Sequence, residues 1–484
     1  MTIEVGQSYL LFCVLAGANH SISYVGTFFA SSLLSAPLAS ATLGTLWLGN
    51  AIAGLLFAVR FQKNLGLRAG LYLSFAGFAI QMAGLWVALV WPNYGLMAPV
   101  CSGIAGVTSA IWWNCQSLVV ETHCQRVFSL VKSSQTRLNE VSAHPDPIVV
   151  RSTFNQVWTF IYQFVNVLIF LSLSLFQYIK LADIAQLIGL LSVIGVVSTL
   201  LLVFVTPGLD HHPPKPPSEN PGTGESLGLL DVGRLLVSDP RAALLAPFQI
   251  AFSVTISLLG FYVNGNQVYS FDNQQPGGLF LGLFEAWGYV FSAFSAYPYN
   301  WIIRRWGSKG SNLVMQFGAA CFSLCGIICL WFLPKGVSAT WPVLLSIKAI
   351  FGLGRGVFEG ENRSIFINLF AGPKLVTALC LQGALTGLAG GVSFLAADVV
   401  SEDQAAIICV AVGVLSLLSF SCLALNLELR RDPGRVIELT AENYGKFDDS
   451  SWTWSELYIG LCGIRFSETF VYRTREEYLL LQDE

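Results

Sequence analysis

Long apolar runs recur along almost the whole chain, and they constrain its fold more than any other feature. Each run is long enough to cross a hydrocarbon core of about 30 Å as a helix. Only 11% of the 484 residues are charged, whereas an ordinary soluble domain has about 25%. The sequence therefore predicts an all-α membrane protein with twelve transmembrane helices, at residues 8–35, 41–60, 68–91, 97–121, 152–178, 182–206, 242–264, 277–303, 312–333, 340–367, 375–398 and 404–427.

The longest polar interruption, HHPPKPPSENPGTGESLG at 211–228, separates six of these spans from the other six. Its richness in Pro, Gly and Ser is typical of a flexible linker. We therefore expect two six-helix bundles joined by this linker and followed by a polar tail. The predicted boundaries are 1–206 and 242–427 for the bundles, 207–241 for the linker and 428–484 for the tail.

Cationic residues indicate which loops face the cytoplasm, because short cytoplasmic loops are enriched in Lys and Arg. With a cytoplasmic N-terminus the outer loops hold only Lys180 and Lys335. This asymmetry predicts cytoplasmic N- and C-termini, but it does not distinguish the plasma membrane from an endomembrane. The inner loops then hold Arg60, Lys63, Arg68, Arg126, Lys132, Arg137, Lys215, Arg234, Arg241, Arg304, Arg305, Lys309 and Lys374.

The two halves echo each other in sequence. LGLRAG at 65–70 and WGSKG at 306–310 both place a Gly, a cation and a Gly ahead of an apolar span. Two six-helix repeats joined by a long cytoplasmic loop resemble the layout of major facilitator transporters. In that fold the loop after the second helix of each half carries a basic, glycine-containing signature, although the usual Asp is absent here. The resemblance makes Arg60, Lys63, Arg68, Arg304, Arg305 and Lys309 candidate gating residues.

Short motifs carry a narrower resemblance. GIAGVTSAIWWNCQSLVVE (103–121), RSTFNQVWTFIYQFVNVLIF (151–170) and IFGLGRGVFEGENRSIFINLF (350–370) are similar to segments of the uncoordinated-93-like family of the major facilitator superfamily. Two departures are Arg355, where relatives usually have Asp, and Ser117, where they usually have Gly. The resemblance implies either a transporter or ion-homeostasis protein, or a regulatory or trafficking partner of channels and receptors.

Charges inside the tenth span are costly in a membrane and need a partner or a cavity. With a rise of about 1.5 Å per residue from the start of the span, Lys348 lies about 10 Å deep, Arg355 about 21 Å and Glu359 about 27 Å. Arg355 and Glu359 are four residues apart and can pair, and Glu285 on the eighth span matches the depth of Lys348. These four residues either form closed ion pairs or line a pathway. Glu361 and Arg363 are expected near the cytoplasmic surface.

Uncharged polar residues lie near mid-membrane in other spans, and they complete the predicted pathway. Resemblance to the superfamily places the first, fourth, seventh and tenth helices around a central cavity. Hydrogen bonding between helices is the alternative role for the amides, and His20 either couples transport to protons or is structural. The residues are Asn19, His20, Asn114, Gln116, Gln163 and Asn166, and the resemblance of the eleventh span to the uncoordinated-93-like family adds Gln382.

Motifs of catalysis are missing from the loops. We find no Ser/His/Asp cluster, phosphate-binding glycine loop or metal-ligand spacing, so we expect neither an enzyme nor a resident metal or cofactor. No basic cluster points to nucleic acid. The sequence favours a transporter that moves a small solute or ion across the bilayer by alternating access. The alternative is a non-transporting regulatory or trafficking subunit that binds a membrane channel or receptor.

Overall fold

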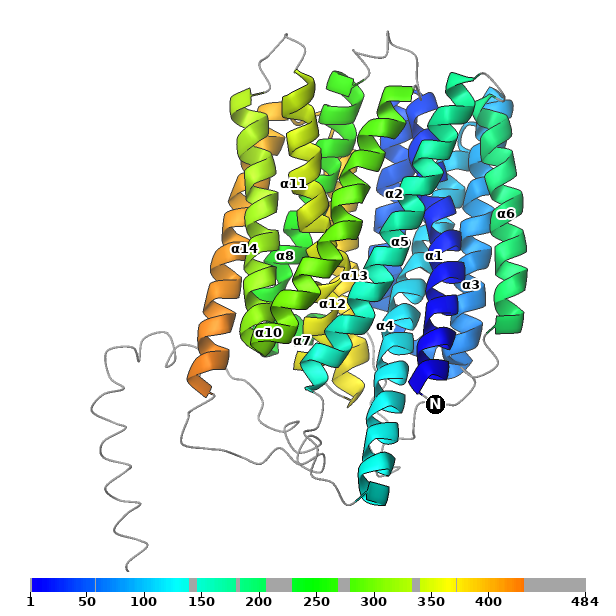
Figure 1. Cartoon of the computed structure of the whole chain (residues 1–484). Coiled ribbons are helices and arrows are strands. Elements are labelled where there is room, and N and C mark those ends of the chain that lie inside the picture. Colours follow the sequence, from blue (N-terminus) through cyan, green and yellow to red (C-terminus); the bar gives the residue numbers. More distant parts are fainter. Residues whose placement is uncertain are drawn as a thin grey trace, which may run out of the picture.

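The structure, a computed structural model, describes residues 2–56, 58–138, 146–179, 183–205, 229–268, 279–332, 340–370 and 372–430. Throughout these residues the regular elements are helices, arranged side by side as a bundle (Figure 1). The first half contains α1 (Thr2–Leu33), α2 (Ala36–Leu56), α3 (Ala58–Val90), η1 (Pro92–Tyr94), α4 (Met97–Leu138), α5 (Pro147–Tyr178) and α6 (Ile184–Val205). The second half contains α8 (Pro240–Ser257), η3 (Leu258–Val268), α10 (Leu279–Phe332), α11 (Trp341–Glu359), α12 (Glu361–Leu369), α13 (Gly372–Leu395) and α14 (Glu402–Arg430).

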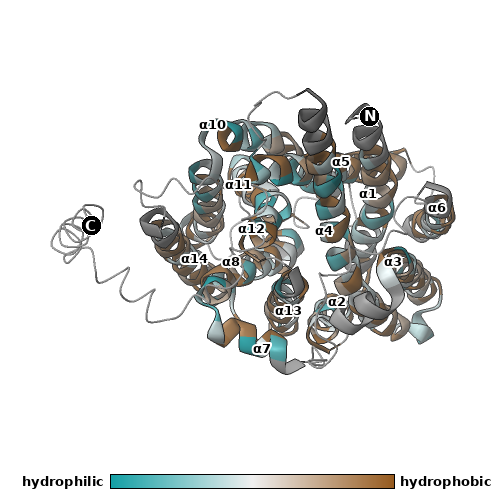
Figure 2. Ribbon diagram, turned by 90° about the horizontal axis from the view of Figure 1, so that it is seen from below, coloured by the Kyte–Doolittle hydropathy of each residue, from teal (hydrophilic) through white to brown (hydrophobic). Residues whose placement is uncertain are grey.

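Each of the twelve predicted spans coincides with helix in the described part of the chain. Nine helices there are long and apolar enough to cross a membrane. This count is lower than twelve for physical reasons. The eighth and ninth spans are continuous as α10, the apolar part of α6 at Gln186–Leu201 is short, and α4 is more polar. The helix ribbons in Figure 2 are coloured brown, that is hydrophobic, over much of their length, as expected for helices in contact with lipid.

Both halves bend at a glycine in the signature loops. Gly66 in α3 has φ 76° and Gly307 in α10 has φ 55°, a left-handed region that favours glycine because it lacks a Cβ atom. Each is the first glycine of the repeated Gly–cation–Gly pattern. The sequence echo therefore corresponds to a shared backbone feature.

The halves meet along two related seams. α2 packs against α13, and α5 packs against the first part of α10. These pairs join the second helix of one half to the fifth of the other, as a two-fold relation between six-helix repeats requires. Glycine permits the close approach at the first seam, because a Cβ at Gly387 would lie 2.6 Å from the backbone nitrogen of Ala51.

The first and the last described helices have their outer termini at the same end of the bundle. α1 starts and α14 stops there (Figure 1), and we name this the termini-proximal end. The opposite, termini-distal end contains the α1–α2 turn at residues 34–35. The described part of the predicted linker is helical: α7 (Leu229–Ser238) packs against α2, α8 and α13, and so contacts both halves. The remainder of the linker and the tail from residue 431 lie outside the described residues.

Candidate functional site

A cavity of about 390 Å³ lies between the two halves. It extends from the centre of the bundle to Leu34 and Ala36 at the termini-distal end. Its walls come from α1, α4, α8 with η3, and α11 with α12, the four helices expected around a central pathway, and additionally from α2, α3, α5 and α13. Its lining includes His20, Tyr24, Asn50, Gln81, Trp113, Asn114, Tyr162, Phe252, Asn264, Arg355, Phe358, Glu359, Arg363 and Gln382.

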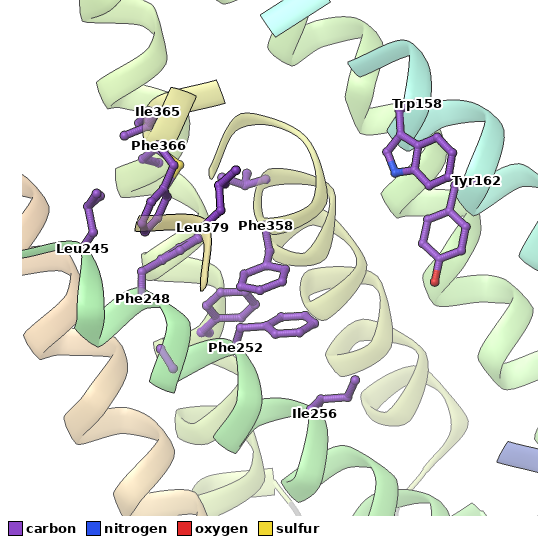
Figure 3. Packing of buried hydrophobic residues seen from close by; sticks show 14 of the residues in the cluster. Trp158, Tyr162, Leu245, Phe248, Phe252, Ile256, Phe358, Ile365, Phe366 and Leu379 are labelled. Carbon is purple, nitrogen blue, oxygen red and sulfur yellow. The ribbon is translucent and has the colours of Figure 1, made fainter. Parts of the chain in front are cut away.

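The cavity wall is largely aromatic. Phe252 on α8 and Phe358 on α11 stack almost parallel, with ring centroids 3.7 Å apart, and Figure 3 shows them facing each other near Ile256. Tyr162 on α5 belongs to the opposite half (Figure 3). A solute in this cavity therefore contacts apolar surface from both halves.

Three charged residues line the cavity within its described part: Arg355, Glu359 and Arg363. Arg363 and Glu359 form a close pair, with Nη2 and Oε2 2.7 Å apart. Arg355 also faces Glu359, as its spacing in the sequence predicted, but Nη2 and Oε1 are 3.8 Å apart. Two buried guanidinium groups thus share one carboxylate.

Tyrosine hydroxyls take the place of a second carboxylate beside Arg355. Its Nη1 donates to the hydroxyl of Tyr289 at 2.8 Å and contacts that of Tyr24 at 3.3 Å. The two rings lie 4.6 and 4.9 Å from the guanidinium carbon, a cation–π arrangement. The Nε atom of Arg355 is buried without a hydrogen-bond partner, so this cation is incompletely satisfied.

Arg363 is more completely enclosed. Gln116 on α4 accepts a hydrogen bond from its Nη1 at 2.7 Å, and the ring of Trp113 lies 4.0 Å from its guanidinium carbon. Gln116 itself does not line the cavity, and instead joins α4 of the first half to α12 of the second.

The expected pair between Glu285 and Lys348 is present. Lys348 Nζ donates to Glu285 Oε1, which also accepts a 2.8 Å hydrogen bond from Asn264. Phe284 and Phe351 place their rings within 5.6 Å of the ammonium group. Both charged residues are buried and neither lines the cavity. They therefore form a closed ion pair between α10 and α11.

Glu361 and Arg363 are buried, so the solvent contact implied by their expected place near the cytoplasmic surface is wrong. Their exposed fractions are 0% and 3%. The prediction measured depth along one straight helix, but the helix breaks at Gly360, where α11 ends and α12 begins. A Cβ at Gly360 would lie 2.8 Å from Gln156 on α5. The neighbouring half therefore covers α12 and replaces solvent.

The uncharged predicted residues separate into two groups. His20, Asn114 and Gln382 line the cavity, and the His20 ring lies 4.7 Å from the Trp113 ring and 5.2 Å from that of Tyr162. Asn19 instead donates to Gly195 O and Ser198 Oγ on α6, both at 2.9 Å. The remaining two, Gln163 and Asn166, are buried on α5 outside the cavity lining.

The signature-loop cations whose side chains the structure describes do not line the cavity. Arg68 contacts the hydroxyl and ring of Tyr72 within its own helix. The side chains of Arg60 and Lys63 lie outside the described residues. Arg304, Arg305 and Lys309 are exposed near the bend in α10.

Sequence reasoning missed the tyrosines around Arg355 and the asparagine Asn50 on α2. Tyr24 and Tyr289 lie in apolar runs, where aromatic residues ordinarily pack in the core or face lipid. Only the general tendency of arginine to stack on aromatic rings could have suggested them.

Comparisons with known proteins identify the fold. No protein-family model and no curated protein matches the chain. Among solved structures, it is similar to a bacterial homologue of the iron transporter ferroportin in an outward-facing state, with a TM-score of 0.56 and 15% identity over 86% of this chain and 98% of that one. It is also similar to the proton:xylose symporter XylE of the major facilitator superfamily, with a TM-score of 0.56 and 13% identity over 87% of this chain and 94% of that one. The resemblance to the uncoordinated-93-like family stays a prediction. The chain has the all-α, multi-pass membrane fold of major facilitator transporters.

Proposed function

We propose that this protein transports a small solute or ion by alternating access, through rocking of its two halves around the central cavity. The observation that carries the proposal is that the cavity reaches the termini-distal end while hydrogen bonds between the halves close the termini-proximal end. A site enclosed on one side only is what a carrier presents in one of its two states. The first neighbour named above is an outward-facing protein, which agrees with this arrangement.

The termini-proximal closure is polar, and we name it the seal. Ser152 Oγ donates to Glu361 at 2.6 Å, and Asn155 Nδ2 donates to Ser364 Oγ at 3.0 Å. Both contacts join α5 to α12. The seal also includes hydrogen bonds from Thr153 to Asn300 and from Arg151 to Asn368, each 3.1 Å long.

Hydrogen bonds suit a reversible closure. Each contributes a net of about 0.5–1.5 kcal/mol, so a few of them hold a closed state that thermal motion still opens. When the halves rock, these groups become accessible to water on the termini-proximal side. We place this side in the cytoplasm, because Lys and Arg concentrate in the loops at that end.

Within this proposal, the residues that line the cavity form the solute pathway. His20, Asn114, Arg355, Glu359 and Gln382 contact the solute directly. Asn19, Gln116, Gln163, Asn166, Glu285 and Lys348 maintain the helices that carry those residues. The cations of the signature loops act at the rim of the bundle as the halves move.

The test is flux into proteoliposomes across a panel of inorganic ions and of anionic, cationic and neutral organic solutes. Cysteines at Asn155 and Ser364 are cross-linked across the seal, and the bond is verified by mass spectrometry. We expect cross-linking to stop flux and reduction to restore it. Controls are each single-cysteine variant and Thr255→Cys, which lies beside native Cys409, 3.1 Å away within the second half.

Two outcomes contradict the proposal. Undiminished flux through a verified cross-link would exclude opening at the seal. Absence of flux for every solute, together with a channel or receptor that copurifies stably, would instead favour a regulatory or trafficking subunit.

A further inference from the structure

We propose that the cavity binds a small organic monocarboxylate, with the carboxylate at Arg355 and the apolar body against the aromatic wall. This inference rests on the proposed function, since it names the class of solute that the cavity accepts. It starts from the charge balance of the cavity. Among the described lining residues there are two arginines and one carboxylate, which leaves one positive charge when His20 is neutral.

The surplus charge is located at Arg355. Glu359 is 2.7 Å from Arg363 but 3.8 Å from Arg355. A buried charge without a close counter-ion is costly, by several kcal/mol. A bound carboxylate would offset this cost and accept hydrogen bonds from the fork of the guanidinium group. A single negative charge balances the site, whereas a dianion would exceed the surplus.

The direction of approach follows from the two tyrosines. Tyr24 lines the cavity, and its hydroxyl makes the longer contact with Arg355, at 3.3 Å. Tyr289 makes the shorter contact, at 2.8 Å, and does not line the cavity. An anion that enters from the cavity therefore replaces the weak Tyr24 contact and leaves the Tyr289 contact in place.

The rest of the wall defines the body of the ligand. Phe252, Phe358 and Trp113 supply apolar faces, and the amides of Asn50 and Asn114 supply a few hydrogen bonds. Asn50 Oδ1 is buried without a partner. Binding sites for small organic molecules are mainly apolar with few polar groups, in cavities of about 300–1,000 Å³. An aromatic or short aliphatic monocarboxylate fits this combination of size, charge and wall.

A ligand held in this way touches both halves. Arg355 and Phe358 belong to the second half, and Tyr24 and Trp113 to the first. A bound ligand therefore bridges the two halves, and its binding can change the equilibrium between the state open at the termini-distal end and the state open at the termini-proximal end.

The experiment measures binding by the full-length protein in lipid nanodiscs, with calorimetry and thermal shift. The probes are benzoate and hexanoate, with benzamide as the neutral isostere and benzylammonium as the cation. We expect the two carboxylates to bind and to raise the unfolding temperature, and the amide and the cation to bind at least about tenfold more weakly. Arg355→Gln should weaken carboxylate binding by about tenfold to a hundredfold, and Arg355→Lys by less.

Lys374→Gln is the matched control, because it removes an exposed cation on α13 outside the cavity. Circular dichroism and size-exclusion profiles verify the fold of each variant.

Preferred binding of benzylammonium or benzamide would overturn the inference, as would failure of both carboxylates to bind or undiminished binding by Arg355→Gln. If the carboxylates fail while another class shows flux that the seal cross-link stops, the ligand class is wrong and transport stands. If carboxylates bind through Arg355 but nothing is transported, the site stands and transport is wrong.

Discussion

Lys348 and Arg355 lie about two turns apart on α11, both at 4% exposure, yet they have opposite electrostatic surroundings. Lys348 has its own carboxylate, Glu285, and a ring on either side. Arg355 shares Glu359 with Arg363 and relies on tyrosine hydroxyls. Lys348 and Glu285 form a neutral pair away from the cavity. Arg355, Arg363 and Glu359 together leave one positive charge at the cavity wall. Charge balance, more than depth in the membrane, separates a structural pair from a candidate binding site.

The largest expected effect comes from removing one partner of the closed pair. Lys348→Met leaves Glu285 buried without its cation, which should cost about 3–5 kcal/mol of stability. Thermal unfolding in detergent should show a strong loss, and Glu285→Gln combined with Lys348→Met should recover most of it. Strictly additive losses in the double variant would contradict the pairing.

Glu361 extends the comparison to a carboxyl group whose described hydrogen-bond partners are the hydroxyls of Ser152 and Ser311. Glu361→Ala leaves both hydroxyls without this acceptor, which should weaken the seal by about 1–3 kcal/mol. In a background with a cysteine at Ser364, maleimide should then label the thiol about tenfold faster or more.

Glu361→Gln is the matched control for this effect, since it keeps an acceptor oxygen at the same place and should label at an intermediate rate. Equal labelling of all three proteins would show that Glu361 does not hold the seal.

Arg355→Gln should differ from Lys348→Met in kind as well as in size. It removes a surplus charge rather than half of a neutral pair, and the desolvation cost that disappears is opposed by the loss of the contacts with Tyr24 and Tyr289. We therefore expect the unfolding free energy to change by less than about 1 kcal/mol, while carboxylate binding weakens by about tenfold to a hundredfold. A loss of stability as large as that of Lys348→Met would mean that Arg355 is structural. Unfolding curves of both variants, recorded in the same detergent, decide between these possibilities.

The sequence was sufficient to predict the fold and one of the two charge clusters. Apolar runs identify the helices because every span must be apolar and long enough to cross the hydrocarbon core as a helix. The depths of Glu285 and Lys348 could be matched because their two helices cross the membrane in the same direction. The burial of Glu361 could not be predicted in this way. Depth along a helix gives the distance from the membrane edge, but burial depends on α5 from the other half. The contacts of Tyr24 and Tyr289 with Arg355 also depend on packing, since neither residue differs in type from those that face lipid.

The smallest expected effect tests whether the comparison extends to uncharged groups. Asn19 is within hydrogen-bond distance of three oxygen atoms on α6, at 2.9 to 3.0 Å, whereas Asn114 lines the cavity and donates to Cys380 Sγ of the other half at 3.2 Å. Because hydrogen bonds between membrane helices average about 0.6 kcal/mol, Asn19→Ala should lower the unfolding free energy by about this amount and leave benzoate binding unchanged. Asn114→Ala should cost less stability but weaken benzoate binding. If Asn19→Ala had the larger effect on binding, a position in the cavity lining would not distinguish the pathway from the scaffold.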